Sequence, residues 1–595
     1  MSYVLWAKAV TRPRVDDLKM RQSCGRLALL RRLLLWIGVV SLAWALVTAL
    51  SGGFRIPIGL GRLQSHDAAR PLLIAVVLLA FYTAHFGEYW TSDLGVVASK
   101  AVNATAIAFA CAVLTIFIGI HWGAFIGAGP DASGYVSQAD RWRRGQLTVP
   151  VPNWGQQGTW TNAAVSATPV GYTVDSSRTK MVPVYSIGFP LVMAGFELVG
   201  GRKAVFLVVP LLGAVAIWAT YRIGGLLLDV WAGAIGAVLL LVSPTFLWML
   251  VQPMSDVPVM ACWTTSLVAA MQMSPNAPAF AGAAAALAVL IRPNTVPVAI
   301  VPLLLVLSAS PSTTSRIRRA ALFIGPVVAA AVLIAALNAL LYGSPLKSGY
   351  GSLSDLYSIE YLIPNTKQYA SWFSSTQTPL AFLWLAAPLL AAGGSERLRL
   401  LIITVIYPLL VYAMYAAYLP WHEWWYLRFL LPAFPVVCAA VGAVAVTVIK
   451  CLRRSGVALA AIFVVLASVV VHEWRFVREA GVFRYATDDQ RFAMAVEFAN
   501  TLPRDAVLVS VAYSGTLNFY AGRDVLRWEV VAPEQFDEVL TYLRRDGRTL
   551  YFIGDPFEEV AFKSYFATTD AAARFDAGRI VTGGVFVVAD LTPRE

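Results

Sequence analysis

The chain has 595 residues, of which 58% are hydrophobic and 13% are charged. Soluble globular proteins carry about 25% charged residues, so this composition excludes that class and indicates a polytopic membrane protein. We assign the formal net charge of +12 to cytoplasmic loops that contact anionic lipid, and we expect no nucleic acid as a partner.

Apolar runs along the chain predict about thirteen transmembrane helices. They lie near residues 33–50, 71–86, 105–125, 204–226, 230–251, 257–273, 279–291, 296–307, 320–341, 379–392, 400–418, 427–448 and 457–472. The two runs around Arg292 are short, so they fit either two spans or one broken hairpin.

Lys and Arg in short loops indicate the orientation, because such loops favour the cytoplasmic side. Basic clusters precede the first span and follow several later ones; they comprise Lys8, Arg12, Arg14, Lys19, Arg21, Arg26, Arg31, Arg32, Arg316, Arg318, Arg319, Arg397, Arg399, Lys450, Arg453 and Arg454. With alternating spans they all fall on the N-terminal side, which is therefore predicted to be cytoplasmic. Loop 51–70 is the exception, since it is placed outside although it carries Arg55, Arg62 and Arg70.

The same pattern predicts four regions. They are a basic cytoplasmic segment at 1–32, two additional transmembrane helices at 33–100, a transmembrane core at 101–472 with outer loops 127–203 and 342–378, and an extracytoplasmic α/β domain at 473–595. The five cysteines fall in spans or on the cytoplasmic side, so no disulfide framework is expected outside.

Local patterns refine the outer regions. Residues 153–170 are rich in Gly, Gln, Thr and Asn and predict a flexible loop. The apolar run 191–199 is too short to span and predicts an interfacial or re-entrant helix. In the C-terminal region, strand patterns occupy 506–512, 549–553 and 579–590, and a helical pattern occupies 533–545.

Asp131 follows the span at 101–125 directly and lies at the predicted membrane–water boundary. A carboxylate beside lipid is costly unless it is paired or used. An ordinary loop aspartate is the alternative. Other ionisable or aromatic residues predicted on the same side are Tyr135, Asp140, Lys180, Tyr185, Asp256, Arg292, Lys347, Tyr350, His422, Glu423 and Arg428.

Each of these residues also has a structural alternative. Asp256 fits a helix N-cap as well as a binding residue. Arg428 follows an aromatic segment, so it fits either interfacial anchoring or phosphate binding. The pair His422–Glu423 favours a polar lining over a metal site. The chain lacks a P-loop, a Gly-x-Ser-x-Gly elbow and a His-Glu-x-x-His motif. The chemistry that remains is deprotonation of a hydroxyl by a carboxylate and binding of a phosphate by Lys or Arg.

An ordered set of motifs resembles the integral-membrane GT-C glycosyltransferases, in particular the protein O-mannosyltransferase and aminoarabinose-transferase group. The motifs are Asp131-Ala-Ser-Gly-Tyr135, Pro183-Val-Tyr-Ser-Ile-Gly-Phe-Pro190, Gln252-Pro-Met-Ser-Asp256, Ile291-Arg-Pro293, Tyr342-Gly-Ser-Pro-Leu-Lys-Ser-Gly-Tyr350 and Arg428-Phe-Leu-Leu-Pro432. Many relatives carry an Asp-Glu pair in the first loop, whereas here Ala132 follows Asp131.

The resemblance implies a GT-C-like helical membrane fold and a role for each matched residue. Asp131 would be the general base, while Lys180, Lys347 and Arg428 would contact the donor phosphate. Substrate would be bound by Tyr135, Asp140, Tyr185, Asp256, Arg292, Tyr350, His422 and Glu423. No cofactor is certain, and a divalent cation stays open.

The leading hypothesis is an inverting glycosyltransferase of the bacterial inner membrane. It would move a sugar from a polyprenyl-phosphate donor to a hydroxyl of an envelope glycan, lipid or protein at the outer face. The alternative is a lipid-linked sugar flippase or exporter without glycosyl transfer. Carriers of that kind often show internal repeats and mid-membrane charges, whereas here the charges lie at one surface.

Overall fold

The computed structural model describes residues 15–51, 54–58, 61–65, 67, 69–90, 92–93, 103–308, 313–452, 455–580 and 586–592. Residues 1–14 of the predicted basic segment lie outside these ranges, as do Arg453 and Arg454 of the last basic cluster. The chain divides into an N-terminal unit, Met1–Ala106 with Ala445–Arg475, and a main unit, Ile107–Val444 with Phe476–Glu595.

The N-terminal unit contains a pair of packed helices, α1 (Val15–Ser51) and α2 (Ala69–Phe86). A short hairpin, β1 (Phe54–Ile58) with β2 (Gly61–Ser65), lies between them in the chain. Asp93 is fully buried and accepts hydrogen bonds from Arg31, Arg32 and Tyr82. The charge of Asp93 is therefore fully compensated within this unit.

The main unit contains most of the apolar helices. They are α4 (Ala104–His121), α9 (Val208–Leu227), α10 (Val230–Val242), α11 (Pro244–Leu250), α12 (Asp256–Ala270), α13 (Ala277–Ile291), η3 (Pro293–Ala299), α14 (Ile300–Ser308), α15 (Thr313–Tyr342), α17 (Leu362–Gln377), η5 (Pro379–Leu390), α18 (Gly394–Leu401), η6 (Ile402–Ile406), α19 (Tyr407–Ala416), η7 (Trp424–Ala433) and α20 (Phe434–Leu452). The first turn of α4 and the end of α20 from Ala445 belong to the N-terminal unit, as does most of the next helix, α21 (Gly456–Glu479), which leads to the C-terminal region.

Within the described ranges, seven helices are long and apolar enough to cross a membrane, or eight if the bent pair α10–α11 forms one span. The pair bends by 63° at Ser243, which separates the two helices, and Pro244 begins α11. The remaining predicted spans in the main unit fall on shorter apolar helices, including α12, α13 and η5. The polytopic helical fold is confirmed, and the count of thirteen spans stays a prediction.

The C-terminal region forms a small α/β domain, as predicted. Its sheet has the order β7-β6-β8-β10-β9, in which β6 runs parallel to β7 and β8, and β10 runs antiparallel to β8 and β9. The elements are α22 (Tyr485–Thr501), β6 (Val507–Val509), α23 (Ser514–Tyr520), β7 (Val525–Leu526), α24 (Phe536–Arg545), β8 (Leu550–Gly554), α25 (Pro556–Tyr565), α26 (Ala571–Ala577), β9 (Arg579–Ile580) and β10 (Val587–Asp590). Residues 581–585 of the predicted strand 579–590 lie outside the described ranges.

The segment after α4 is ordered, which corrects the prediction of a flexible loop at 153–170. It holds α5 (Gly129–Arg143), α6 (Asn153–Gln157), α7 (Ala163–Ser166) and α8 (Gly188–Gly200), with a small sheet of β3 (Val149–Pro150), β5 (Lys180–Pro183) and β4 (Tyr172–Val174). The physical reason is burial, because Trp154 and Trp160 are 2% and 3% exposed and lie in the core of the C-terminal domain.

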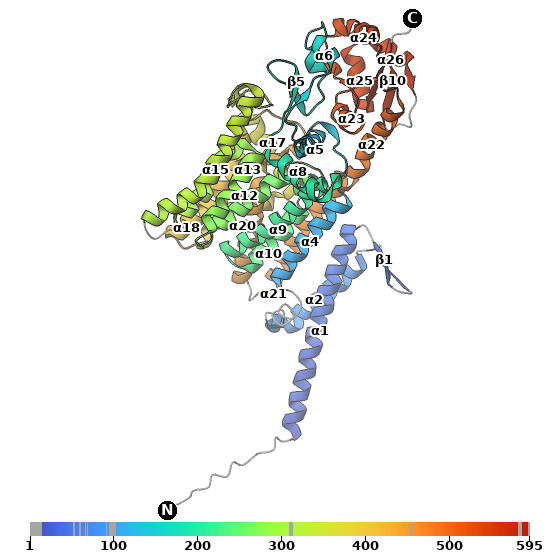
Figure 1. Cartoon of the computed structure of the whole chain (residues 1–595). Coiled ribbons are helices and arrows are strands. Elements are labelled where there is room, and N and C mark those ends of the chain that lie inside the picture. The colour runs from blue at the N-terminus through green and yellow to red at the C-terminus, as the bar shows by residue number, and fades with distance from the viewer. Residues whose placement is uncertain are drawn as a thin grey trace, which may run out of the picture. The chain divides into compact units, whose positions relative to one another are not determined.

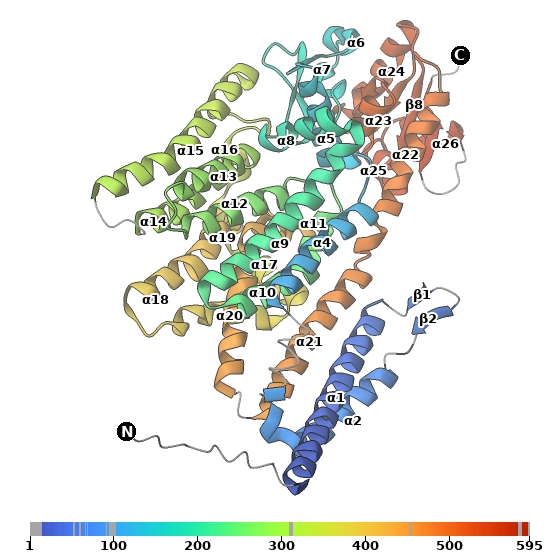
Figure 2. The same ribbon diagram turned by 60° about the horizontal axis from the view of Figure 1, so that its bottom comes forward.

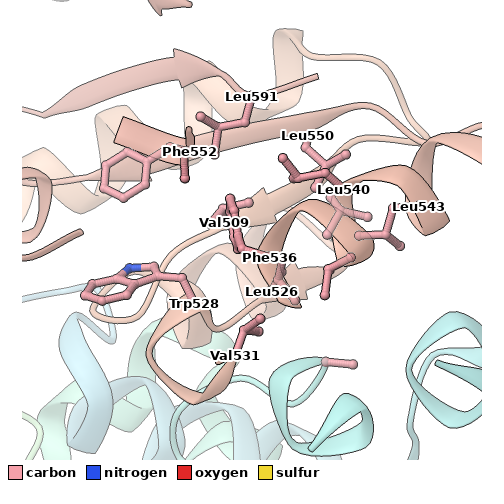
Figure 3. Packing of buried hydrophobic residues seen from close by; sticks show 14 of the residues in the cluster. Val509, Leu526, Trp528, Val531, Phe536, Leu540, Leu543, Leu550, Phe552 and Leu591 are labelled. Atoms are coloured by element: carbon pink, nitrogen blue, oxygen red, sulfur yellow. The ribbon is translucent and has the colours of Figure 1, made fainter. Parts of the chain in front are cut away.

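This segment and the C-terminal domain share one hydrophobic core. Figure 3 shows the part of this core that the C-terminal domain contributes, in which Val509, Trp528 and Phe552 are buried between helices and strands. Figures 1 and 2 place the two regions side by side at the same end of the main unit. The shared core therefore fixes the segment from α5 to α8 beside the ends of the apolar helices.

Candidate functional site

Helix α5 places Asp131 and Tyr135 at the candidate site. Gly129 has φ 69° and Pro130 follows it, a combination that starts a helix sharply. Asp131 lies in the first turn, where the helix dipole favours a negative charge. Tyr135 is four residues further along and therefore shares its face.

The carboxylate of Asp131 is held by two side chains from distant parts of the chain. Tyr185 donates its hydroxyl to Oδ1 at 2.8 Å, and Arg428 donates Nη2 to Oδ2 at 3.2 Å. The Asp131 side chain is nevertheless 37% exposed. It is therefore oriented yet reachable by a reactant.

Tyr185 acts as a permanent donor in this arrangement. Its side chain is 5% exposed. Burial, and then the negative charge of Asp131, raise the pKa of the Tyr185 hydroxyl well above its usual value. The phenol therefore keeps its proton and continues to donate to the carboxylate.

A second carboxylate, Asp256, lies deeper and organises two arginines. It is fully buried at the start of α12. Arg292, which ends α13, donates Nη2 to Asp256 Oδ1 at 2.6 Å, and Arg428 Nε lies 4.0 Å from the same oxygen. Arg428 therefore bridges the accessible carboxylate of Asp131 and the buried carboxylate of Asp256.

Three polar atoms at this bridge are buried without a hydrogen-bond partner in the described part of the chain. They are Asp256 Oδ2, Arg292 Nη1 and Arg428 Nε. Leaving a buried polar atom unpaired costs about 1–3 kcal/mol, and more when it is charged. Such atoms in one cluster are the expected sign of a polar ligand site.

Aromatic rings line the same site. The rings of Tyr135 and Tyr185 lie 4.4 Å apart, and Tyr350 lies 5.9 Å from Tyr185. The Arg428 guanidinium lies 5.1 Å from the Tyr426 ring and 5.5 Å from the Phe429 ring. These rings limit access of water and leave their faces available to apolar or sugar surfaces.

The structure thus gathers six of the predicted residues: Asp131, Tyr135, Tyr185, Asp256, Arg292 and Arg428. Tyr350 joins them at the rim, where its side chain is 48% exposed. Sequence reasoning missed Ser255, which contacts the Tyr135 hydroxyl at 3.0 Å and Arg292 Nε at 3.3 Å. Its position next to Asp256 was the available signal.

The other predicted residues lie in different surroundings. Asp140 pairs with Arg143 and Arg144, at 3.2 and 2.9 Å. Lys180 starts β5 and its backbone N–H binds Asp175 at 3.0 Å. The remaining three, Lys347, His422 and Glu423, are exposed.

Metal ligands do not gather in the described ranges, where no three His, Cys, Asp or Glu residues form a cluster. At the site itself, both carboxylates face arginines. This charge pattern suits an anion next to a carboxylate, and it shows no set of oxygens that would hold a divalent cation.

Comparisons with known proteins show which proteins the chain is similar to. Residues 186–338 match the family model of dolichyl-phosphate-mannose-protein mannosyltransferase. That segment contains Asp256 and Arg292, and it lies between Asp131 and Arg428 in the chain. A search of curated proteins gives no match.

Solved structures of membrane transferases are also similar. ArnT from Cupriavidus metallidurans bound to undecaprenyl phosphate has 14% identity and a TM-score of 0.48, over 83% of this chain and 100% of that chain. The Archaeoglobus fulgidus oligosaccharyltransferase tethered with an acceptor peptide has 11% identity and a TM-score of 0.48, over 86% and 75%. The arabinofuranosyltransferase AftD from Mycobacteria has 15% identity and a TM-score of 0.48, over 83% and 42%.

The family-model match covers the stretch that carries the second carboxylate and its arginine. Over this stretch it therefore supports the resemblance that the motifs within it predict. The chain is a polytopic membrane protein that resembles the GT-C glycosyltransferases, and its residues 186–338 are similar to the dolichyl-phosphate-mannose-protein mannosyltransferase family.

Proposed function

We propose that the protein is a membrane glycosyltransferase that moves a sugar from a polyprenyl-phosphate donor to a hydroxyl group. The observation that carries the proposal is the accessible carboxylate of Asp131, which pairs with the largely enclosed Arg428. Arg428 and its neighbour Arg292 each keep a donor that has no hydrogen-bond partner in the described part of the chain. A base and an anion site are the two functions that such a transfer requires side by side.

In the proposed reaction, Asp131 takes the proton of the acceptor hydroxyl. The acceptor oxygen then forms a bond to the anomeric carbon of the sugar while the bond from that carbon to the phosphate oxygen breaks. The polyprenyl phosphate leaves with the bonding electron pair, and attack from the opposite face inverts the anomeric configuration. Water is not consumed.

Arg292 and Arg428 are assigned to the leaving phosphate. Planar guanidinium groups bind phosphate oxygens through charge-assisted hydrogen bonds, and Arg292 Nη1 and Arg428 Nε are the unpaired donors. Asp256 holds Arg292 in place. Lys180 and Lys347, predicted at this position from the resemblance, are exposed. Lys180 pairs with Pro150 of β3 and its N–H donates to Asp175, and the Lys347 N–H donates to the Ser344 carbonyl.

The donor class is supported by the matched family, whose description names a sugar linked to dolichyl phosphate. A polyprenyl-phosphate donor stays in the membrane, so the site must lie near its surface. We place the protein in the bacterial inner membrane with a cytoplasmic N terminus and an extracytoplasmic C-terminal domain. The acceptor is then an envelope glycan, lipid or protein.

The test is a transfer assay with the purified full-length protein in lipid nanodiscs. The lipid-linked sugar that accumulates in a deletion strain is supplied as the donor, and released polyprenyl phosphate and transferred sugar are measured. The proposal predicts equal amounts of both products. A flippase, in contrast, would move the intact donor across vesicles and release no polyprenyl phosphate.

A further inference from the structure

The C-terminal domain contacts the chain immediately before the helix that carries Asp131. Gly127 donates its backbone N–H to the Tyr520 hydroxyl at 2.9 Å and accepts a hydrogen bond from Thr516 Oγ1 at 2.8 Å. Both residues belong to α23 and lie four positions apart, on one face of this helix. Both backbone polar groups of Gly127 are therefore held by one turn of the C-terminal domain.

Helix α5 has no cap of its own at this end. Its N-cap residue is Ala128, whose side chain cannot accept a hydrogen bond from the first turn. An uncapped first turn leaves its backbone donors without partners in the helix, and a missing cap costs about 1 kcal/mol. The start of α5 therefore depends on contacts from outside the helix.

Packing reinforces this contact. Ala128 is 6% exposed and belongs to the core of the C-terminal domain, together with Leu517. A Cβ placed on Gly515 would lie 2.2 Å from Ser133 Oγ. The helices α23 and α5 therefore pack so closely that only glycine fits at residue 515 without displacing a neighbour. Ser514 Oγ also accepts the backbone N–H of Val170 at 3.1 Å.

The contact continues to the partner of Asp131. A Cβ on Gly171 would lie 2.7 Å from the Gly134 backbone, and a Cβ on Gly134 would lie 2.2 Å from the Tyr185 ring. Tyr185 in turn donates to Asp131. One continuous set of close contacts thus leads from α23 to the candidate base.

We propose that Thr516 and Tyr520 are positioning residues for the transfer reaction, and that the C-terminal domain sets the place of Asp131. This inference rests on the proposed function, because it takes Asp131 as the base. A displacement of about 1 Å at a reacting group can cost about a hundredfold in rate. Loss of the Gly127 contacts therefore lowers turnover without a change at the donor site.

The test uses Tyr520→Phe and Thr516→Val in the full-length protein. Each substitution removes one hydroxyl and keeps the shape of the side chain. We expect kcat to fall by about tenfold to a hundredfold, with the KM for the lipid-linked donor within about twofold of the wild-type value. The matched controls are Tyr565→Phe and Thr541→Val, whose hydroxyls bind only within the C-terminal domain; they should leave kcat unchanged.

Combination with Asp131→Asn separates positioning from general destabilisation. If Tyr520 acts through the base, Tyr520→Phe has no further effect on kcat in the Asp131→Asn background. If Tyr520→Phe lowers kcat by the same factor in the wild-type and in the Asp131→Asn backgrounds, the inference is overturned and the proposed function stays intact. Full activity of Asp131→Asn would remove Asp131 as the base and with it the premise of this inference, whereas absence of transfer by the wild-type protein would overturn the proposed function itself. Unchanged kcat in both Tyr520→Phe and Thr516→Val would also reject the positioning role.

Discussion

Two buried carboxylates in the main unit differ in how they are satisfied. Glu558, in α25, accepts hydrogen bonds on both oxygens, from the backbone N–H groups of Val511 and Ala512 and from Trp528 Nε1 at 3.0 Å. Asp256 is fully buried, yet one of its oxygens has no hydrogen-bond partner in the described part of the chain.

The difference distinguishes a structural acid from the acid that we propose to be part of a binding site. Glu558 joins the end of β6, α25 and the Trp528 turn, and both of its oxygens accept hydrogen bonds within the domain. The unpaired oxygen of Asp256 lies beside unpaired donors of Arg292 and Arg428. Buried polar atoms that lack hydrogen bonds in the folded protein are satisfied when a polar ligand binds beside them.

The largest expected effect is at the accessible member of the site. Asp131→Asn keeps the size of the side chain but cannot take the acceptor proton. We expect turnover to fall by about 10²–10⁴-fold, the usual contribution of a positioned base, with normal expression. Transfer is measured with the purified protein, and near-wild-type turnover would remove Asp131 from the mechanism.

Arg428→Lys separates phosphate binding from interfacial anchoring. The charge remains, but the planar fork between Asp131 and Asp256 is lost. A hydrogen bond to a charged group contributes about 1.5–3 kcal/mol, so we expect about a tenfold to hundredfold loss in kcat/KM for the donor. Lys347→Arg, at an exposed position, is the milder comparison. Unchanged kinetics for Arg428→Lys would favour the anchor, because lysine also reaches the interface.

Tyr185→Phe tests the orientation of the base. It removes the hydroxyl that donates to Asp131 Oδ1 and keeps the ring that packs against Tyr135. We expect about a tenfold fall in kcat, from the loss of a charge-assisted bond. Tyr542→Phe, whose ring packs on Trp160 in the shared core, is the control and should retain full turnover. A wild-type kcat for Tyr185→Phe would show that Arg428 alone orients the carboxylate.

Glu558→Gln should have the smallest effect on transfer, within about twofold, but it should change how stability depends on pH. Burial raises the pKa of Glu558 to about 7. Because the folded protein holds this proton more tightly than the unfolded chain does, protonated Glu558 stabilises the fold fully at a pH below the pKa of the unfolded chain. This contribution is lost as the pH rises to about 7. Wild-type protection of β6 and β8 against hydrogen exchange should therefore fall between pH 5 and pH 8, after correction for the intrinsic rate.

The Glu558→Gln protein should lack this part of the pH dependence, because glutamine does not titrate. Both proteins are measured at full length under identical conditions. An identical pH dependence in the two proteins would show that other groups control the stability of the sheet.

Much of the fold could be predicted from local patterns. The apolar runs, the helix 533–545 and the strands at 506–512 and 549–553 depend on periodicity that a single sequence shows. The structure of residues 153–170 could not be predicted in this way, because their composition is polar. Their order comes from two tryptophans that are buried by residues about 370 positions later in the chain. One of these residues is Asp524, which accepts a hydrogen bond from Trp154 Nε1.

The candidate site could also be predicted only in part, because some of its residues lie in recognisable local motifs and others are brought together by long-range contacts. The motifs that supply Asp131, Asp256, Arg292 and Arg428 are short and lie at span ends, so they could be identified one by one. Lys180 and Lys347 are exposed in the structure, and their assignment to the donor phosphate stays a prediction. Ser255 lies next to Asp256 in a predicted motif, but its contacts with Tyr135 and Arg292 depend on how distant segments meet, which a single sequence does not reveal.

The contact between Gly127 and Tyr520 joins residues 393 positions apart. At a synthesis rate of about 5–20 residues per second, α5 waits roughly 20–80 seconds before α23 exists. During that interval the chain can insert its helices but lacks the contacts that hold the start of α5. Under the positioning role proposed above, the site is therefore complete only after α23 has been synthesised and has folded against the start of α5.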